Sequence, residues 1–399
     1  MRPRFRFSIG SLLLVGALTL AGCKKEQAPA AGDNKGTGTG VEALDKLAKQ
    51  VQDKVGEATK LAGDERKGLD PEQYEKLILA LSACELKETG VDFKCEAYNT
   101  YREARSRNTR LKDLAGMSSR LGLKHLTDKS PTVRYVAAGL LKSLFGSGAA
   151  AQEAVLKAAP EEKNPIVLAR MISAVASSAK RNPKVAEWVV KMADHTEPVV
   201  RREALNWLAS SWYMDVAGAH DKLMEKIEKD PDQKVRQTAC HYAGKTGNEK
   251  LLPLYKKLTA KPDKDPEMYT ACMRGLMEMW NPFLTRKIPA SQKAYTLTMA
   301  RMNDKPRGKD RPPWIMMNDF GRVPRDNPPW YNEKAVKKML VSVALDDKAR
   351  WLARTGAVRS LARLKAKPEL EQIKKALGTK TEFDNKQVLR TVDQELAKL

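Results

Sequence analysis

Five cysteines and four histidines are the residues of this 399-residue chain best suited to metal binding or covalent chemistry. No histidine stands in an HExxH or HxH arrangement and no two cysteines form a CxxC pair. The chain also lacks a GxSxG nucleophile motif, a P-loop and a GxGxxG fingerprint. The adjacent acids Asp346 and Asp347 lie at an expected helix start, where capping explains them. We therefore predict a protein that is not an enzyme and needs no metal or cofactor, with an uncharacterised enzyme as the remote alternative.

Cys23 follows a segment with the layout of an export signal. Three arginines lie within the first six residues, and Ile9–Leu20 forms an apolar run of twelve residues. A helix needs about 20 apolar residues to cross a bilayer, so this run has the length of a signal-peptide core instead. The small residues Ala21 and Gly22 before Cys23 suit a signal peptidase, which needs a narrow backbone at the cleavage point.

Leu20-Ala21-Gly22-Cys23 resembles the lipobox of bacterial lipoproteins. The resemblance implies that residues 1–22 are a cleaved signal peptide and that Cys23 becomes a lipid-bearing first residue, with a diacylglycerol and an N-acyl chain such as palmitate. Two or three chains anchor a protein stably. Lys24, rather than Asp, after the cysteine implies the outer membrane, on its periplasmic or surface face. The alternative is an ordinary secretory signal in which Cys23 is incidental.

Export would place the other four cysteines in an oxidising compartment, where disulfides form. Cys84 and Cys95 flank Lys87-Glu88-Thr89-Gly90, which is typical of a helix C-terminus and turn. We predict a Cys84–Cys95 disulfide across a helical hairpin, worth about 2–3 kcal/mol for so short a loop. For Cys240 and Cys272 two alternatives stay open: a second disulfide, or two small buried apolar residues.

The charge of the chain favours acidic partners. The formal net charge is +23, and removal of residues 1–22 would take away only three arginines and no acids. Candidate partners of a basic exported protein are anionic lipid headgroups, lipopolysaccharide, acidic glycans, extracellular DNA and acidic proteins. The alternative is that the charge serves solubility alone.

The N-terminal part of the predicted mature protein divides into a tether and a helical region. Residues 23–40 contain no Leu, Ile, Val or aromatic residue and form a flexible lipid-anchored tether with a reach on the order of 23 Å. Residues 41–110 carry helices, of which the first, Val41–Ala62, has a stripe of small apolar residues typical of a docking helix. Asp70-Pro71-Glu72-Gln73 predicts a capped helix start. The helices Pro71–Glu88 and Phe93–Asn108 would form the hairpin.

An internal repeat fills residues 111–280 and 333–399. Most windows begin with Pro or a polar residue, followed by an apolar residue at position two, often Arg at three, in most windows a small residue at six, and an apolar residue at ten. The windows begin at Pro131, Pro165, Pro198, Gln233, Pro266, Trp351 and Lys386. The position-six residues are Ala137, Met171, Ala204, Ala239, Cys272, Ala357 and Val392. A repeat of about 34 residues with helical periodicity predicts an all-α solenoid.

Three windows resemble HEAT repeats: Asp128-x-x-Pro131-x-Val133-Arg134-x-x-Ala137, Pro198-x-Val200-Arg201-x-x-Ala204 and Asp232-x-x-Val235-Arg236-x-x-Ala239. The resemblance implies an armadillo-like helical solenoid of HEAT-like helix pairs, with the N-terminal hairpin before them. It also implies that Asp and Arg pair from one repeat to the next. This ladder would be partial, because Leu168, Tyr269 and Leu389 stand where the other windows have Arg.

Residues 281–332 interrupt the repeats and form a Pro-, Trp- and Arg-rich insertion, with a degenerate helix expected near Tyr295–Met302. Trp314 and Trp330 each follow a Pro-Pro pair, and Arg311 and Arg322 lie among the surrounding charges. Proline holds the chain extended, and Trp and Arg are the residues most often found in binding hot spots. We predict a binding site here, with folding of the tryptophans onto the core as the alternative.

The helix that carries the repeat signature supplies a second candidate surface. In HEAT proteins this helix usually lines the inner face, and its outward positions here are rich in cations such as Arg202, Lys245 and Arg274. A basic groove of this kind would bind a polyanion or an acidic protein segment with salt-sensitive affinity. Ordinary solvated charge is the alternative.

Together these features predict a membrane-anchored HEAT-repeat lipoprotein that acts as a non-catalytic binding or scaffold module in a bacterial cell-envelope assembly. Its partners would be the membrane, through lipidated Cys23, and one or more envelope proteins. The alternative is a direct binder of an anionic envelope polymer, namely lipopolysaccharide, an acidic glycan or extracellular DNA.

Overall fold

The computed structural model describes residues 70–108, 114–142, 148–281, 288–304, 313–324 and 327–399. The predicted signal segment, Cys23, the tether, the helix at 41–62 and Arg311 lie outside the described residues. The predictions made for them stay predictions.

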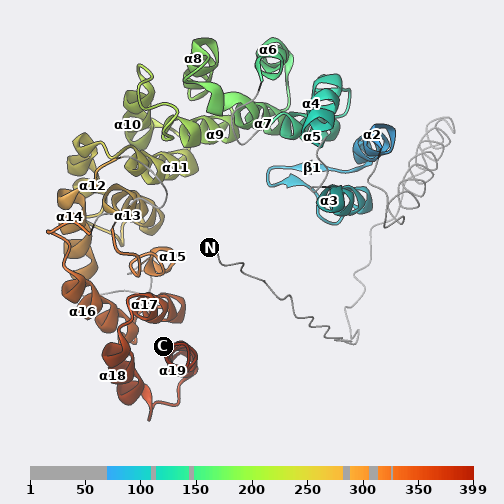
Figure 1. Ribbon diagram of the computed structural model, residues 1–399. Coiled ribbons are helices and arrows are strands. Elements are labelled where there is room, and N and C mark those ends of the chain that lie inside the picture. The colour runs from blue at the N-terminus through green and yellow to red at the C-terminus, as the bar shows by residue number, and fades with distance from the viewer. Residues whose placement is uncertain (1–69, 109–113, 143–147, 282–287, 305–312, 325–326) are drawn as a thin grey trace, which may run out of the picture. The chain divides into compact units, whose positions relative to one another are not determined.

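The described chain is all-α and solenoid-like, which confirms the predicted fold class, and most of its helices lie in two rows (Figure 1). The A row holds α4 (Leu114–His125), α6 (Ala149–Ala158), α8 (Pro183–Met192), α10 (Ala219–Lys229), α12 (Leu252–Leu258), α14 (Gln292–Asn303), α16 (Glu333–Ala344) and α18 (Lys367–Leu377). The B row holds α5 (Pro131–Leu140), α7 (Pro165–Val175), α9 (Pro198–Leu208), α11 (Gln233–Ala243), α13 (Pro266–Trp280), α17 (Trp351–Arg363) and α19 (Phe383–Leu396). Each B helix packs on the A helix before it, and successive B helices pack on one another except between α13 and α17, where α15 (Trp314–Met317) packs on α17.

All seven repeat windows coincide with B-row helices. Six of these helices begin at the expected residue, and α19 begins three residues earlier than its expected start at Lys386. Capping sets several of the starts: the side chains of Ser130, Asn164 and Asp265 each accept a hydrogen bond from a backbone N–H in the first turn, and a proline follows each cap. Every position-six residue is buried, with at most 1% of its surface exposed. Small residues there let neighbouring helices approach closely.

Two arginines, partly buried Arg134 and buried Arg201, link successive repeats. Arg134 donates to Glu162 (Nε to Oε2, 2.7 Å), and Arg201 donates to Asp230 (Nη2 to Oδ1, 2.8 Å). A partial ladder of arginines and acids is therefore present. Each acid, Glu162 or Asp230, lies three residues before the start of the next B-row helix. Asp232, which the resemblance assigned to the ladder, instead accepts a hydrogen bond from the backbone N–H of Val235 and caps α11.

The repeat with Leu168 shows how the ladder is interrupted. The residue that would receive an arginine from position 168 is His195, which stands three residues before the start of α9. Its Nδ1 accepts a hydrogen bond from the backbone N–H of Glu197, at 3.0 Å. Asp230 Oδ1 accepts the equivalent bond from the N–H of Asp232 at 3.0 Å. His195 therefore makes the same hydrogen bond in its turn as Asp230 does, but Leu168 and His195 cannot form the ion pair that Arg201 and Asp230 form.

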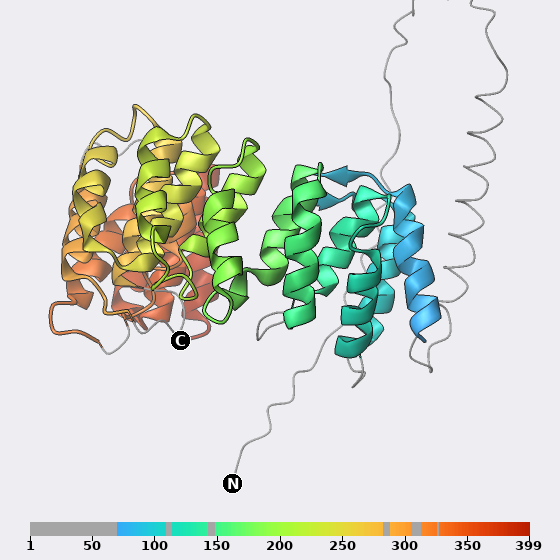
Figure 2. The same cartoon turned by 90° about the horizontal axis from the view of Figure 1, so that it is seen from above.

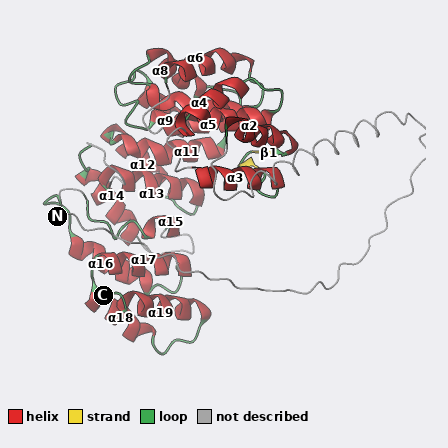
Figure 3. Ribbon diagram, turned by 45° about the vertical axis from the view of Figure 1, so that its right-hand side comes forward, coloured by secondary structure: helices red, strands yellow, loops and turns green. Residues whose placement is uncertain are grey.

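The N-terminal hairpin is shorter than predicted. Helix α2 (Pro71–Ala80) begins with the predicted capping box at Asp70 but ends eight residues before Glu88. A 3₁₀ turn (Leu81–Ala83), strands β1 (Leu86–Lys87) and β2 (Gly90–Val91), and α3 (Glu96–Asn108) follow (Figure 3). The predicted helices Pro71–Glu88 and Phe93–Asn108 are thus wrong at the ends that face each other. A longer first helix would carry the chain away from Cys95, whereas the two-stranded turn returns it.

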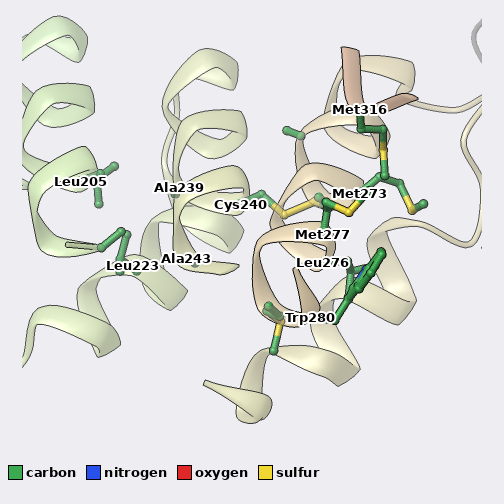
Figure 4. Packing of buried hydrophobic residues seen from close by; sticks show 14 of the residues in the cluster. Leu205, Leu223, Ala239, Cys240, Ala243, Met273, Leu276, Met277, Trp280 and Met316 are labelled. Carbon is green, nitrogen blue, oxygen red and sulfur yellow. A yellow bond between two sulfur atoms is a disulfide. The ribbon is translucent and has the colours of Figure 1, made fainter. Parts of the chain in front are cut away.

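Both cysteine pairs form disulfides. Cys84 joins Cys95 with a Cα–Cα distance of 5.7 Å, as predicted, at the base of the β1–β2 ribbon, whose strands are the arrows in Figure 2. Cys240 on α11 joins Cys272 on α13 with a Cα–Cα distance of 5.0 Å. Figure 4 shows this second bond among the buried side chains of Met273, Leu276 and Met277. Of the two alternatives that the sequence left open for Cys240 and Cys272, the structure has the disulfide.

The insertion contains the parts of a degenerate repeat. Helix α14 takes a place in the A row, where it packs on α12, α13 and α16, and it includes the predicted helix near Tyr295–Met302. The single turn α15 packs closely on α17: a Cβ added to Gly356 would lie 2.7 Å from Cβ of Met317. Ser360 further donates its hydroxyl to the carbonyl of Met317 and accepts the N–H of Gly321 at 2.9 Å.

Candidate binding groove

A hollow of about 1150 Å³ runs along the B row from α9 through α11 to α13 and is bordered by α15 and the start of α17. We call it the central groove. Its charged lining consists of five cations and two acids, namely Arg202, Lys234, Lys264, Arg274, Arg350, Asp265 and Glu267. His241, Tyr242 and Trp314 supply aromatic surface. This mixture of cations, fewer acids and aromatic rings is suited to binding a chain segment with negative charges.

Two smaller hollows continue the central groove. The hairpin hollow, of about 320 Å³, shares Arg202, Thr238 and Tyr242 with it and extends to Arg170 and to Glu88 at the β1–β2 turn. The insertion hollow, of about 50 Å³, shares His241 and Arg274 with it and extends to Arg322. Because each shares lining residues with the central groove, the three hollows form one continuous depression along the B row.

Several cations of the central groove are available to a ligand. The side chains of Lys234, Lys264 and Arg274 make no hydrogen bond or ion pair with any residue in the described ranges. Arg202 differs, because its Nη2 donates to Oε1 of Glu88. A ligand carboxylate can therefore pair with Arg274 or the lysines without first breaking an internal ion pair.

His241 lies among these cations but does not add to their charge. Burial, together with the nearby charges of Arg274 and Lys245, lowers the pKa of His241 to about 3. Its ring stacks on Tyr242 with centroids 4.7 Å apart. Lys245, in the 3₁₀ turn that follows α11, places its Nζ 4.2 Å from the centroid of the Tyr242 ring. At neutral pH the positive potential of the groove therefore comes from Arg and Lys alone.

The structure separates the two tryptophans predicted to act together. Trp314 begins α15, is 45% exposed and lines the central groove. Trp330 is half-buried and packs with its ring centroid 5.4 Å from that of Tyr295, within an aromatic cluster that includes Trp280. Trp314 is thus exposed in the groove, and its binding role stays a prediction, whereas Trp330 follows the alternative of folding onto the core.

The predicted cationic site residues are also divided. Arg202 and Arg274 line the central groove, and Arg322 lines the insertion hollow, where it lies near Asp319 (Nη1 to Oδ1, 3.6 Å). Lys245 does not line the groove and instead covers Tyr242. Sequence reasoning missed Lys234, Lys264 and Arg350, because the loops and helix starts that carry them lie outside the outward positions of the repeat pattern.

No group of three or more His, Cys, Asp or Glu side chains within the described ranges could hold a metal ion. None of the described helices is long and apolar enough to cross a membrane. No protein-family model matches this chain, and no curated protein matches it.

Proposed function

We propose that this protein is a membrane-anchored HEAT-repeat lipoprotein of the bacterial cell envelope. In this proposal it acts as a non-catalytic scaffold by binding an acidic segment of a partner protein in the central groove. The single observation that carries the binding role is the continuous depression along the B row, with unpaired cations beside an exposed tryptophan.

The shape of the depression favours a chain segment as the ligand. Its lining residues come from α7, α9, α11 and α13, so it extends across four successive B-row helices. Solenoid repeats create extended surfaces of this kind and use them to bind partners. Trp314 can supply buried apolar area, and Arg274 can donate two parallel hydrogen bonds to a carboxylate.

The acids in the groove favour a protein over a polyanionic polymer. Asp265 and Glu267 line the central groove, Glu203 lines the hairpin hollow and Glu278 lines the insertion hollow. A polymer with a charge on every unit would meet these carboxylates and be repelled. A peptide with mixed charges can place its own cations or polar groups opposite them.

The cell-envelope location rests on the lipobox resemblance and on Cys23. A lipid anchor and a tether of about 23 Å reach would keep the basic repeats close to an anionic membrane surface. Lys24 favours the outer membrane. If Cys23→Ser removes incorporation of labelled palmitate and releases the protein from the membrane fraction, the anchor is supported; labelled, membrane-bound Cys23→Ser protein contradicts it.

The binding role is tested with two probes, a fluorescent peptide rich in Glu and containing one Trp, and heparin as a polyanion. The groove variant reverses Arg202, Lys234 and Arg274 to Glu. The control variant reverses Lys157, Lys229 and Lys256 to Glu, three exposed lysines of the A row, so that both variants lose the same net charge. We expect the groove variant to lose at least ten-fold in peptide affinity, measured by anisotropy, and the control to stay near wild type.

The direct binding of an anionic polymer is the second candidate, and the net charge of +23 favours it. It predicts tight heparin binding whose affinity falls steeply with salt, as counterion release requires, and weak peptide binding. Equal losses in the groove and control variants would show that overall charge, rather than the groove, binds either probe.

A further inference from the structure

Glu88 and Arg202 lie 114 residues apart in sequence and are in direct contact. Arg202 Nη2 on α9 donates to Oε1 of Glu88, which sits in the turn between β1 and β2. The Glu88 side chain is 59% exposed and the Arg202 side chain 25% exposed. An acidic side chain from another part of the chain thus already occupies one end of the depression.

The hollow around this contact has unused donors. Nε of Arg170 and Nε of Arg202 are buried, and neither has a hydrogen-bond partner among the described residues. Both arginines line the hairpin hollow, on successive B helices. The guanidinium of Arg170 lies over the Tyr135 ring, 5.1 Å from its centroid, which holds it in place. Protein atoms cover both Nε atoms in this structure, so a carboxylate satisfies them only when the guanidinium groups turn toward the hollow as Glu88 leaves.

The other polar residues of the hollow do not compete for the arginines. Glu203 Oε1 accepts a hydrogen bond from Trp207 Nε1 at 2.8 Å, which engages that carboxylate. Asn206 and Thr238 are neutral. Glu88 is therefore the acid that a ligand carboxylate must replace.

The element that presents Glu88 is attached at its base. The ribbon has two residues in each strand, and a ribbon of this size has little stability of its own. The Cys84–Cys95 disulfide and the Lys87–Asp92 ion pair (Nζ to Oδ2, 2.7 Å) fix the base of the ribbon and do not involve Glu88 at its tip. An exposed ion pair such as Glu88–Arg202 is weak. The tip can leave Arg202 while the base stays attached.

We infer that the hairpin hollow is a carboxylate-binding subsite between Arg170 and Arg202, and that Glu88 is an internal stand-in for a Glu or Asp side chain of the bound partner segment. This inference rests on the proposed function of the groove and names the chemistry recognised at its hairpin end. Binding of the partner replaces Glu88 at Arg202 and moves the turn of the ribbon.

The test uses the Glu-rich fluorescent peptide and a peptide of the same sequence with Gln in place of every Glu. Glu88→Gln removes the internal competitor, and we expect it to raise the affinity for the Glu peptide about two- to five-fold. The matched control is Glu85→Gln, on the same ribbon: Glu85 is 70% exposed at its side chain and contacts Lys87 rather than the groove. We expect Glu85→Gln to leave the affinity unchanged, and neither variant to help the Gln peptide.

Arg170→Gln tests the second donor of the subsite. We expect about a ten-fold loss of affinity for the Glu peptide and no further gain when Glu88→Gln is added. Arg359→Gln is its control, since Arg359 is exposed on α17 and lines none of the three hollows. Circular dichroism melting identifies any variant that fails to fold. Hydrogen exchange at the Lys87 and Gly90 amides, which face each other beside the turn, should speed up when the Glu peptide binds wild-type protein.

Equal gains from Glu88→Gln and Glu85→Gln would overturn the subsite, because they would reflect overall charge. So would unchanged affinity in Glu88→Gln while the groove variant still loses binding; the proposed function would then stand without this inference. If wild-type protein binds neither peptide, both the function and the subsite are wrong.

Discussion

Arg201 on α9 and Asp230, in the turn before α11, form a buried two-point ion pair. Nη2 lies 2.8 Å from Oδ1 and Nε lies 2.9 Å from Oδ2, and the two side chains are 7% and 0% exposed. Nη1 of the same guanidinium donates to the carbonyls of His195 and Thr196. One side chain thus ties the turn before its own helix to the turn before the next, which sets how the two repeats stack.

Loss of Asp230 should leave the buried charge of Arg201 without its counterion, and loss of Arg201 should leave buried Asp230 with only the more distant Lys226 Nζ, 3.9 Å away. We expect Arg201→Leu and Asp230→His each to lower the free energy of unfolding by about 3–5 kcal/mol. The double variant Arg201→Leu/Asp230→His copies the natural Leu168/His195 combination, so we expect it to be less destabilised than either single variant. Urea denaturation followed by circular dichroism measures all three, and additive losses would show that the two residues are not coupled.

The disulfide between α11 and α13 should stabilise the middle of the B row. Its sequence separation is 32 residues, against 11 for Cys84–Cys95, and the longer loop predicts about 4 kcal/mol against about 3 kcal/mol. We expect Cys240→Ala/Cys272→Ala to lower the urea midpoint more than Cys84→Ala/Cys95→Ala. Each variant should also lose part of the sensitivity to reductant that wild type shows. Variants as sensitive to reductant as wild type would contradict the pairing.

The contact between α11 and α13 requires glycine at two facing positions. A Cβ at Gly244 would lie 1.9 Å from the carbonyl oxygen of Gly275, and a Cβ at Gly275 would lie 2.4 Å from that of Cys240. We expect Gly244→Ala to destabilise the protein by about 1–3 kcal/mol, because backbone must move. Gly148→Ala is the control: no atom lies within 4 Å of its added Cβ, so only the lower N-cap preference of Ala at the start of α6 should lower stability, by at most about 1 kcal/mol in thermal unfolding.

The free energy of unfolding should decrease as the pH is lowered, because His241 takes up a proton more readily in the unfolded chain. Its folded-state pKa is about 3, whereas a histidine in the unfolded chain titrates near 6.5. Below pH 6.5 the unfolded state therefore binds a proton that the folded state does not, and the free energy of unfolding falls by up to about 1.4 kcal/mol per pH unit.

The measurement for His241 is urea unfolding between pH 7 and pH 5, above the range in which carboxylates titrate. His241→Gln should flatten the pH profile in this window. Some slope should remain, because burial also lowers the pKa of His220. Parallel profiles for wild type and His241→Gln would show that His241 does not carry the effect.

The sequence by itself determined the features that depend on residues close together in the chain. The repeat period located all seven B-row helices, because helical spacing places the position-six residue of each on the buried side. Asp70 and Gln73 predicted their capping box, and the short segment between Cys84 and Cys95 predicted their disulfide. Caps, periodicity and short loops are local, so their geometry follows from spacing alone.

Only the tertiary structure decided which distant residues meet. In the structure, Arg201 pairs with Asp230 rather than Asp232, and Arg202 contacts Glu88. Trp314 lines the groove, whereas Trp330 packs on Tyr295. The physical reason is that these contacts depend on how far each helix pair is shifted and rotated against the next. Close packing across many repeats sets that shift, and no single window of the sequence contains it.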